Sequence, residues 1–201
     1  LENYTNLAAE YNKIQALFGM EEAKFEELGD AQKAFEATAK LWRTADDWKM
    51  KKTRWMTENF TSVKWEEEAK EVQIFFKDAF SLAKKMPNPV SEDLKEQVSD
   101  FKAKIPTIQE LGNPNMRARH WEKIYSAMGK GFCEEIQLET LLEWGVMDHA
   151  EVISDQSATS SGEAQLEDSL ADIESNWTDL KFITLSYRDS TTVFILGGLD
   201  E

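Results

Sequence analysis

The sequence has little of what catalytic, membrane-bound or disulfide-linked proteins need. It holds one cysteine, Cys133, in 201 residues, so no internal disulfide and no thiolate-rich metal cage is possible, and a reducing compartment is expected. Its apolar runs are too short to span a bilayer. Acidic side chains number 38 against 23 basic ones, a net charge of −15, and no local basic patch stands out. We therefore expect neither nucleic-acid nor membrane binding.

Catalytic motifs are also absent. Gly129-Lys130-Gly131 is not a phosphate-binding loop, because position 124 is not glycine and no hydroxyl residue follows the lysine; a helix C-cap is the better interpretation. His120 and His149 have no companion residues at metal-ligand spacing and are interpreted as structural. Cys133 precedes two glutamates that disfavour a thiolate. The residues alone thus predict a non-catalytic helical structural or interaction module, with a small helical enzyme as a minor alternative.

The chain does have aromatic mass, with seven Trp and eleven Phe, which argues against disorder and for a buried core. Lining of a ligand groove is the alternative role for the tryptophans. Apolar residues recur at three and four positions, which predicts successive helices. The expected boundaries are a cap at Gly19, a possible break at Gly29-Asp30, a boundary at Asn59–Ser62, a stop at Met86–Pro89, an N-cap at Ser91, a stop at Pro106, a helix start at Pro114 and a short helix over Leu138–Trp144.

The pattern changes near residue 150. Residues 151–201 carry eleven acidic and two basic residues, and Gln156–Gly162 reads as a loop or weak helix, where we expect any hinge. A helical stripe follows, and then β-rich stretches around 182–187 and 193–196 predict a hairpin. The expected fold is mainly α, an elongated bundle of antiparallel helices with a C-terminal β-hairpin. The expected division is a helical bundle over 1–110 and further helices plus the hairpin over 111–201.

The stretch Leu111–Trp121, LGNPNMRARHW, strongly resembles the Leu-x-Asn-Pro-x-x-x-x-Arg-His-Trp signature of dynein heavy chains, in the segment that builds the linker. Upstream tryptophans are similar to those of axonemal dyneins. The resemblance is clear over residues 41–201, and the further matching positions are Leu41-Trp42, Trp48, Trp55, Phe60, Thr140–Leu142, His149, Glu151, Ile153, Glu163, Glu167, Leu170, Trp177, Phe182 and Gly198–Glu201. The chain departs from the family at Ser160 and Gly162, where we expect a weakened helix, and at Trp144. It is expected to be an excised piece of a longer protein.

The resemblance implies a mechanical role. The linker lies across a ring of AAA+ modules and changes its bend with nucleotide state, moving the tail; ATP and magnesium belong to that ring, and no cofactor is expected in this segment. The implied partners are the ring of the same heavy chain and dynein intermediate or light chains, and the implied location is the cytoskeleton of a cilium or flagellum, in its axoneme. The alternative is a tail-proximal scaffold that docks accessory chains or neighbouring axonemal complexes.

The candidate structural or interaction residues follow from the same signature. We expect Trp121 to point inward, and Trp177 and Phe101 to be buried. Because Arg119 and His120 are successive, we expect them on different faces, with at least one arginine reaching a carboxylate or a helix C-terminus. The full set of candidates is Asn113, Pro114, Arg117, Arg119, His120, Trp121 and Trp177.

Overall fold

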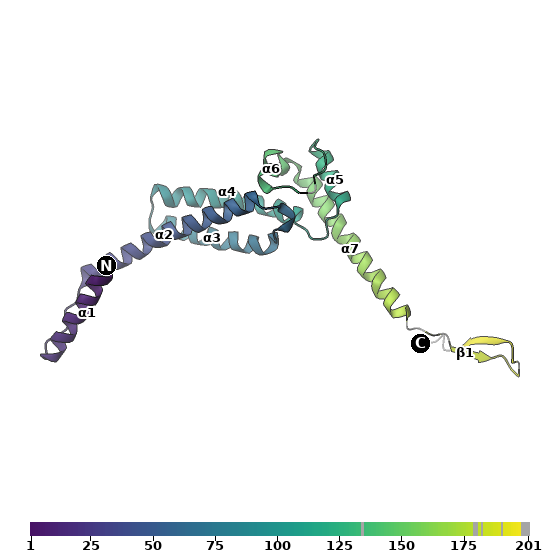
Figure 1. Cartoon of the computed structure of the whole chain (residues 1–201), viewed down its shortest axis with the longest axis horizontal. Helices are drawn as coiled ribbons and strands as arrows, with labels where there is room; N and C mark the ends of the chain where they lie inside the picture. Colours follow the sequence, from purple (N-terminus) through teal and green to yellow (C-terminus); the bar gives the residue numbers. More distant parts are fainter. Residues whose placement is uncertain (134, 179–180, 182, 190, 198–201) are drawn as a thin grey trace.

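The computed structural model describes residues 1–133, 135–178, 181, 183–189 and 191–197. The described chain is mainly helical and elongated, with a compact middle and an arm at each end (Figure 1). One arm consists of α1 and the start of α2; the other consists of α7 and the hairpin of β1 and β2. The expected fold class, an elongated helical bundle with a late hairpin, is confirmed.

The first part of the compact middle is an up-and-down bundle of three helices. It contains α2 (Glu26–Thr57), α3 (Trp65–Lys85) and α4 (Pro89–Leu111). The 3-10 helix η1 (Phe60–Ser62) joins the first two, and the Asn59 side chain accepts a hydrogen bond from the Thr61 amide at 3.2 Å. Asn59 therefore caps this turn, as the sequence predicted for the stretch 59–62.

Two expectations about α4 were wrong. Asn88, and not Ser91, is the N-cap; the two residues form a capping box in which each side chain accepts a hydrogen bond from the other's amide, at 2.9 and 3.1 Å. Pro106 does not end the helix, which continues to Leu111. Ile105, Ile108 and Leu111 are buried around the proline, and their packing outweighs the amide donor that the proline lacks.

The remaining helices pack at one end of this bundle. They are α5 (Ala118–Ala127), α6 (Leu138–Glu143), the 3-10 helix η2 (Val146–His149) and α7 (Ala150–Thr178). The helix expected to start at Pro114 starts at Ala118, because residues 113–116 form a turn in which the Asn113 side chain accepts a hydrogen bond from the Asn115 amide at 3.0 Å. The expected cap at Gly129 is confirmed by its left-handed φ of 67°.

Aromatic rings link these elements into one core. Trp55 stacks on Phe101 with centroids 5.3 Å apart, and Trp48 meets Trp55 edge-on at 5.8 Å. The core continues without a break from Leu41 in α2 to Ile153 in α7. The division of the chain near residue 110 stays a prediction, but buried residues from both sides of that position belong to the same cluster.

Helix α7 covers the stretch where a loop or weak helix was expected. It runs unbroken through Ser160 and Gly162, so the stretch 156–162 is neither a loop nor an interruption in this structure. Ser157 and Ser160 are buried there, and the Ser160 hydroxyl donates to the Ser157 carbonyl at 2.8 Å. Similarly, Gly29-Asp30 does not break α2. At Ser157 and Ser160, burial in the packed part of the chain outweighs weak helix propensity.

The ends of the chain have few buried residues. Helix α1 (Glu2–Leu17) ends just before Gly19, as expected, and buries no residue. Strands β1 (Ile183–Ser186) and β2 (Phe194–Gly197) pair antiparallel, with Leu185 opposite Ile195, which confirms the hairpin. Phe182 and Gly198–Glu201 lie outside the described residues. No helix in the described part of the chain has the length and apolarity needed to cross a membrane.

Candidate functional site

Six of the seven candidate residues gather where α5 and the turn before it meet α7. We call this contact the α5–α7 junction; it is formed by Asn113, Arg117, Arg119 and His120 on one side and by Ser157, Ser160, Ser161, Glu163 and Glu167 of α7 on the other. Pro114 lies in the turn and Trp121 lies beneath it. The seventh candidate, Trp177, lies near the C-terminal end of α7.

Asn113 connects the end of α4 to the serines of α7. Its side-chain amide nitrogen lies 2.9 Å from the Ser157 hydroxyl and 2.8 Å from the Ser161 hydroxyl. The Ser160 hydroxyl and the Ser157 carbonyl are slightly further, at 3.3 and 3.1 Å. The amide has two hydrogens, so it shares them among four acceptors, and the contact tolerates small shifts of α7.

Replacing Asn113 with alanine tests this contact. We expect the free energy of unfolding to fall by about 1–3 kcal/mol, because partly buried serine hydroxyls lose the donor that Asn113 supplies. Urea unfolding of the 201-residue chain measures the change. The matched control is Asn115→Ala in the same turn, for which we expect a change within about 0.5 kcal/mol, since that side chain is exposed. Equal losses for the two variants would contradict the role of Asn113.

Two arginines at the start of α5 pair with two glutamates of α7. Arg117 contacts Glu167, and Arg119 contacts Glu163. A helix N-terminus is unfavourable for cations, so the two carboxylates also compensate the dipole of α5. The Glu167 carboxylate raises the pKa of Arg117 above its usual range, and the hydrogen bond from Arg119 is the main reason why the pKa of Glu163 is lowered. The expected contact of an arginine with a neighbouring carboxylate is confirmed.

His120 adds a buried side chain to the two exposed ion pairs of the junction. Its side chain is only 1% exposed; Nδ1 accepts a hydrogen bond from the Arg117 amide at 3.0 Å, and Nε2 lies 3.0 Å from the Glu163 carboxylate. Since Nδ1 accepts, the ring proton is on Nε2 and is donated to Glu163. The same carboxylate thus holds both Arg119 and His120. Arg119 is exposed and His120 is buried, as expected for successive residues on different faces, and Glu163 nevertheless contacts both.

The lowered pKa of Glu163 gives a dependence of stability on pH. A carboxylate whose pKa is lower in the folded than in the unfolded chain adds stability above its ordinary value of 4.5, and this stability is lost as the pH falls through the folded value. We expect the difference in melting temperature between the wild type and Glu163→Gln to be present at pH 7 and to vanish in acid. Glu174→Gln, further along α7, is the control, and a difference that persists below the folded pKa would contradict the assignment.

Trp121 anchors α5 beneath the junction. Its side chain is 8% exposed and meets the rings of Phe60 and Tyr125, with centroids 5.9 and 6.0 Å away. The inward orientation expected for Trp121 and the burial expected for Phe101 are confirmed. Trp177, by contrast, is 63% exposed, because no described element covers the outer half of α7. Its expected burial is wrong for this chain.

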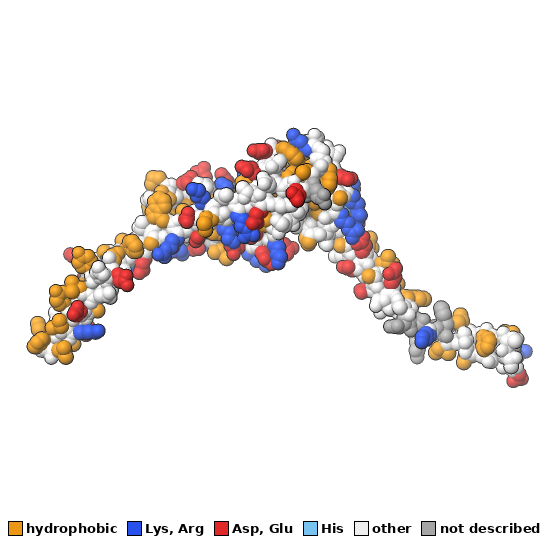
Figure 2. All heavy atoms as spheres, viewed as in Figure 1, with side chains coloured by type: hydrophobic (Ala, Val, Ile, Leu, Met, Phe, Trp, Pro, Cys, Tyr) orange, Lys and Arg blue, Asp and Glu red, His pale blue; other side chains and the backbone are white. Residues whose placement is uncertain are grey.

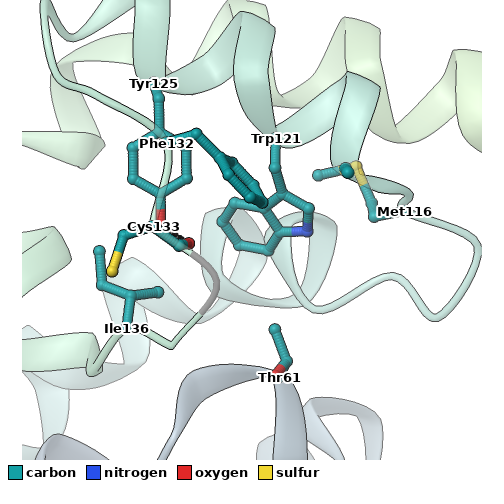
Figure 3. Close-up of a pocket in the computed structure, with 8 residues that line it drawn as sticks. Thr61, Met116, Trp121, Tyr125, Phe132, Cys133 and Ile136 are labelled. Carbon is teal, nitrogen blue, oxygen red and sulfur yellow. Dashed lines mark hydrogen bonds between the residues drawn. The ribbon is translucent and has the colours of Figure 1, made fainter.

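A cavity of about 240 Å³ adjoins Trp121. Figure 3 shows Trp121, Tyr125 and Phe132 along one side of it and Ile136 and Thr61 along the other. The Tyr125 hydroxyl donates to the Cys133 carbonyl at 3.2 Å, and burial raises the pKa of Tyr125 to about 12. Thr61 and Cys133 line the cavity beside aromatic and apolar side chains, and none of the described lining residues is charged. Among the described residues, no group of three or more His, Cys, Asp or Glu is placed to hold a metal ion.

Sequence reasoning missed the α7 half of the junction. Glu163 and Glu167 were noted as matching positions but were not assigned a role, and the serines were interpreted as helix breakers. The usable signal was charge: two glutamates four residues apart share a helix face and complement two arginines placed two residues apart. Gly112 also lies close to Trp65 of α3, where an added Cβ would come 2.4 Å from the ring, and nothing in the sequence signals this approach.

Comparison with known proteins agrees with the resemblance noted in the sequence. A family model described as "Dynein heavy chain, N-terminal region 2" matches residues 28–201. Human dynein axonemal heavy chain 6 is 33% identical over 198 residues, which cover 96% of this chain and 5% of that protein. Mouse dynein axonemal heavy chain 1 is 30% identical over 208 residues, covering the whole chain and 5% of that protein. A Chlamydomonas reinhardtii protein described as "Dynein-1-beta heavy chain, flagellar inner arm I1 complex" is 24% identical over 208 residues.

The chain therefore belongs to the dynein heavy chain family, and it corresponds to an N-terminal region of the heavy chain and not to the ATPase ring. It spans about 5% of the length of the curated relatives named above.

Proposed function

We propose that this chain is a mechanical linker segment of an axonemal dynein heavy chain, a microtubule motor, and that it transmits ATP-driven changes of the AAA+ ring to the tail. The observation that carries the proposal is the α5–α7 junction. It fixes the direction in which α7, a helix of 29 residues, leaves a packed aromatic core. A rigid exit helix clamped by paired charges suits a lever, since close-packed helices transmit displacement and a flexible connection does not.

The rest of the assignment follows from that role. ATP and magnesium act in the ring of the parent heavy chain, and this segment needs no cofactor. Its partners are the ring of the same heavy chain and other subunits of an axonemal dynein complex, including intermediate or light chains. It works at the cytoskeleton, in the axoneme of a cilium or flagellum, as the names of its relatives suggest.

A charge swap in the motor tests the lever. In a heavy chain carrying Glu167→Arg, which opposes Arg117 with a like charge, we expect microtubule-stimulated ATP turnover to persist while gliding velocity falls. The reason is that two like charges repel each other where α5 meets α7 and weaken the clamp on α7, while the loss of one half-exposed ion pair costs little stability and leaves the core folded. Adding Arg117→Glu restores an opposite pair, and we expect it to restore gliding. Normal gliding by the single variant, with the fold intact by circular dichroism, would count against the lever.

A second candidate is a tail-proximal scaffold that docks accessory chains. It is favoured by the outer half of α7, where apolar side chains are exposed beside Asp168, Asp172 and Glu174; the apolar residues are Leu166, Leu170, Ile173 and Trp177. A scaffold of this kind predicts salt-sensitive capture of axonemal subunits by the 201-residue chain, lost in Leu170→Asp. It also predicts that the Glu167→Arg variant glides normally, which separates it from the lever.

A further inference from the structure

Helix α1 carries an apolar face that nothing in the described structure covers. Tyr4, Leu7, Tyr11, Ile14 and Phe18 follow one another at spacings of three, four, three and four residues. Their side chains are between 43% and 77% exposed, and α1 has no buried residue at all. A helix of 16 residues is marginal in water by its own propensity, so its stability has to come from packing of this face.

The first half of α2 carries further exposed apolar residues. Leu28, Phe35 and Trp42 are seven residues apart, and Phe35 and Trp42 are 58% and 59% exposed. The buried residues of α2 begin only at Leu41, so the helix before that point projects beyond the core. Figure 2 shows hydrophobic side chains along this arm of the molecule. We call the set Tyr4, Leu7, Tyr11, Ile14, Phe18, Leu28, Phe35 and Trp42 the N-terminal apolar face.

Polar contacts hold the segment between α1 and α2 against α1. The Ala23 amide donates to the side-chain oxygens of Asn12 and Gln15, at 3.1 and 2.9 Å, and the Asn12 amide donates back to the Ala23 carbonyl at 3.3 Å. Asn12 and Gln15 lie next to the apolar positions and not among them. The contacts of α1 with this segment thus involve polar side chains beside the apolar positions and not the apolar side chains themselves.

Spacing and area indicate what covers the face. A repeat of seven residues is the pattern of helices that pack side by side with knobs in holes, so the occupant is helical. The five aromatic residues of the face, each contributing about 150–250 Å² when buried, expose on the order of 600 Å² together. A standard interface buries about 800 Å² per partner, so one helix or one helical hairpin suffices. Charge says little about the partner of this face, since residues 1–18 hold only Glu2, Glu10 and Lys13 as charged side chains.

We propose that the N-terminal apolar face docks a helix or helical hairpin from the same heavy chain, outside residues 1–201, and so completes a bundle with α1 and α2. The curated relatives are on the order of twenty times longer than this chain, and mouse dynein axonemal heavy chain 1 aligns with all of it, α1 included. A heavy chain therefore always brings other segments of its own together with α1, and these segments can supply the docking helix. The proposal concerns a different surface from the α5–α7 junction and does not depend on the lever function.

Cysteine labelling of the intact heavy chain tests the proposal. Two variants are compared, Tyr11→Cys on the apolar face and Lys13→Cys two residues on, which points to another side of α1 and is also exposed. Maleimide labelling is followed peptide by peptide with mass spectrometry, so other cysteines do not interfere. We expect Tyr11→Cys to react at least about tenfold more slowly in the heavy chain than in the 201-residue chain, and Lys13→Cys to react at similar rates in both. Hydrogen exchange of the wild-type heavy chain over residues 4–18 gives the same comparison without any substitution.

Three results would overturn the proposal. If Tyr11→Cys and Lys13→Cys react with maleimide at equal rates in the heavy chain, the apolar face is not covered there. Slow labelling of Tyr11→Cys already in the 201-residue chain, together with a dimer mass by light scattering, would assign the face to a second copy. Protection that is absent from the purified heavy chain and appears only when other dynein subunits are added would assign it to a separate protein. None of these measurements depends on gliding, so the lever and the docking face can fail independently.

Discussion

Replacing Trp121 with alanine is expected to lower the free energy of unfolding of the 201-residue chain by about 3–5 kcal/mol. The indole is 8% exposed and contacts Phe60 of η1 as well as Tyr125 of its own helix, so truncation opens a void between η1 and α5. A cavity of about 240 Å³ already adjoins the ring, and removal of the ring enlarges it. Urea unfolding, followed by circular dichroism, measures the loss.

Trp177→Ala is the matched control for Trp121→Ala. The same substitution removes the same side chain from a helix, but Trp177 is 63% exposed, so we expect a change within about 0.5 kcal/mol. A large loss for Trp177 would mean that the outer half of α7 packs against something within this chain. A small loss for Trp121 would mean that the neighbouring rings collapse into the space and that α5 is not anchored by its tryptophan.

The contrast between these two tryptophans shows how far the sequence predicts the fold. Periodicity correctly indicated that both lie on the apolar side of a helix. It does not indicate whether another element covers that side, because cover depends on tertiary contacts and on chain beyond the segment. The element types, the hairpin and the caps at Gly19 and Gly129 followed from local chemistry, and they are confirmed.

Local rules failed where tertiary contacts oppose them. Pro106, Ser160 and Gly162 all lower helix propensity, yet the helix continues through each of them. Ile105 and Ile108 are buried beside the proline, and Asn113 reaches the Ser160 hydroxyl from the end of α4. A penalty of about 1–3 kcal/mol per residue is smaller than the packing energy of a helix that completes a core. The junction itself was half predictable: its basic side carries the family signature, and its acidic side lies 43 or more residues away in the sequence.

Gly112→Ala is expected to destabilise the chain by about 1–3 kcal/mol, the usual cost of overpacking. A Cβ atom at position 112 would lie 2.4 Å from Cδ1 of Trp65 and 2.9 Å from Cγ, well inside contact distance. Trp65 is unable to move aside easily, since its ring stacks on Phe60 at 5.0 Å and its Nε1 donates to the Phe60 carbonyl at 3.1 Å. The backbone φ of Gly112, −80°, is accessible to alanine, so the penalty is one of space and not of conformation.

Gly162→Ala is expected to stabilise the chain, whereas Gly112→Ala is expected to destabilise it. Position 162 lies inside α7, and a Cβ there meets nothing within 4 Å, so alanine should gain about 0.5–1 kcal/mol from its higher helix propensity. Thermal unfolding of the two variants beside the wild type measures both shifts in one experiment. If both variants are destabilised, α7 is not a regular helix at position 162. If both are stabilised, α4 does not approach Trp65 closely, and the turn that presents Asn113 to α7 is placed differently.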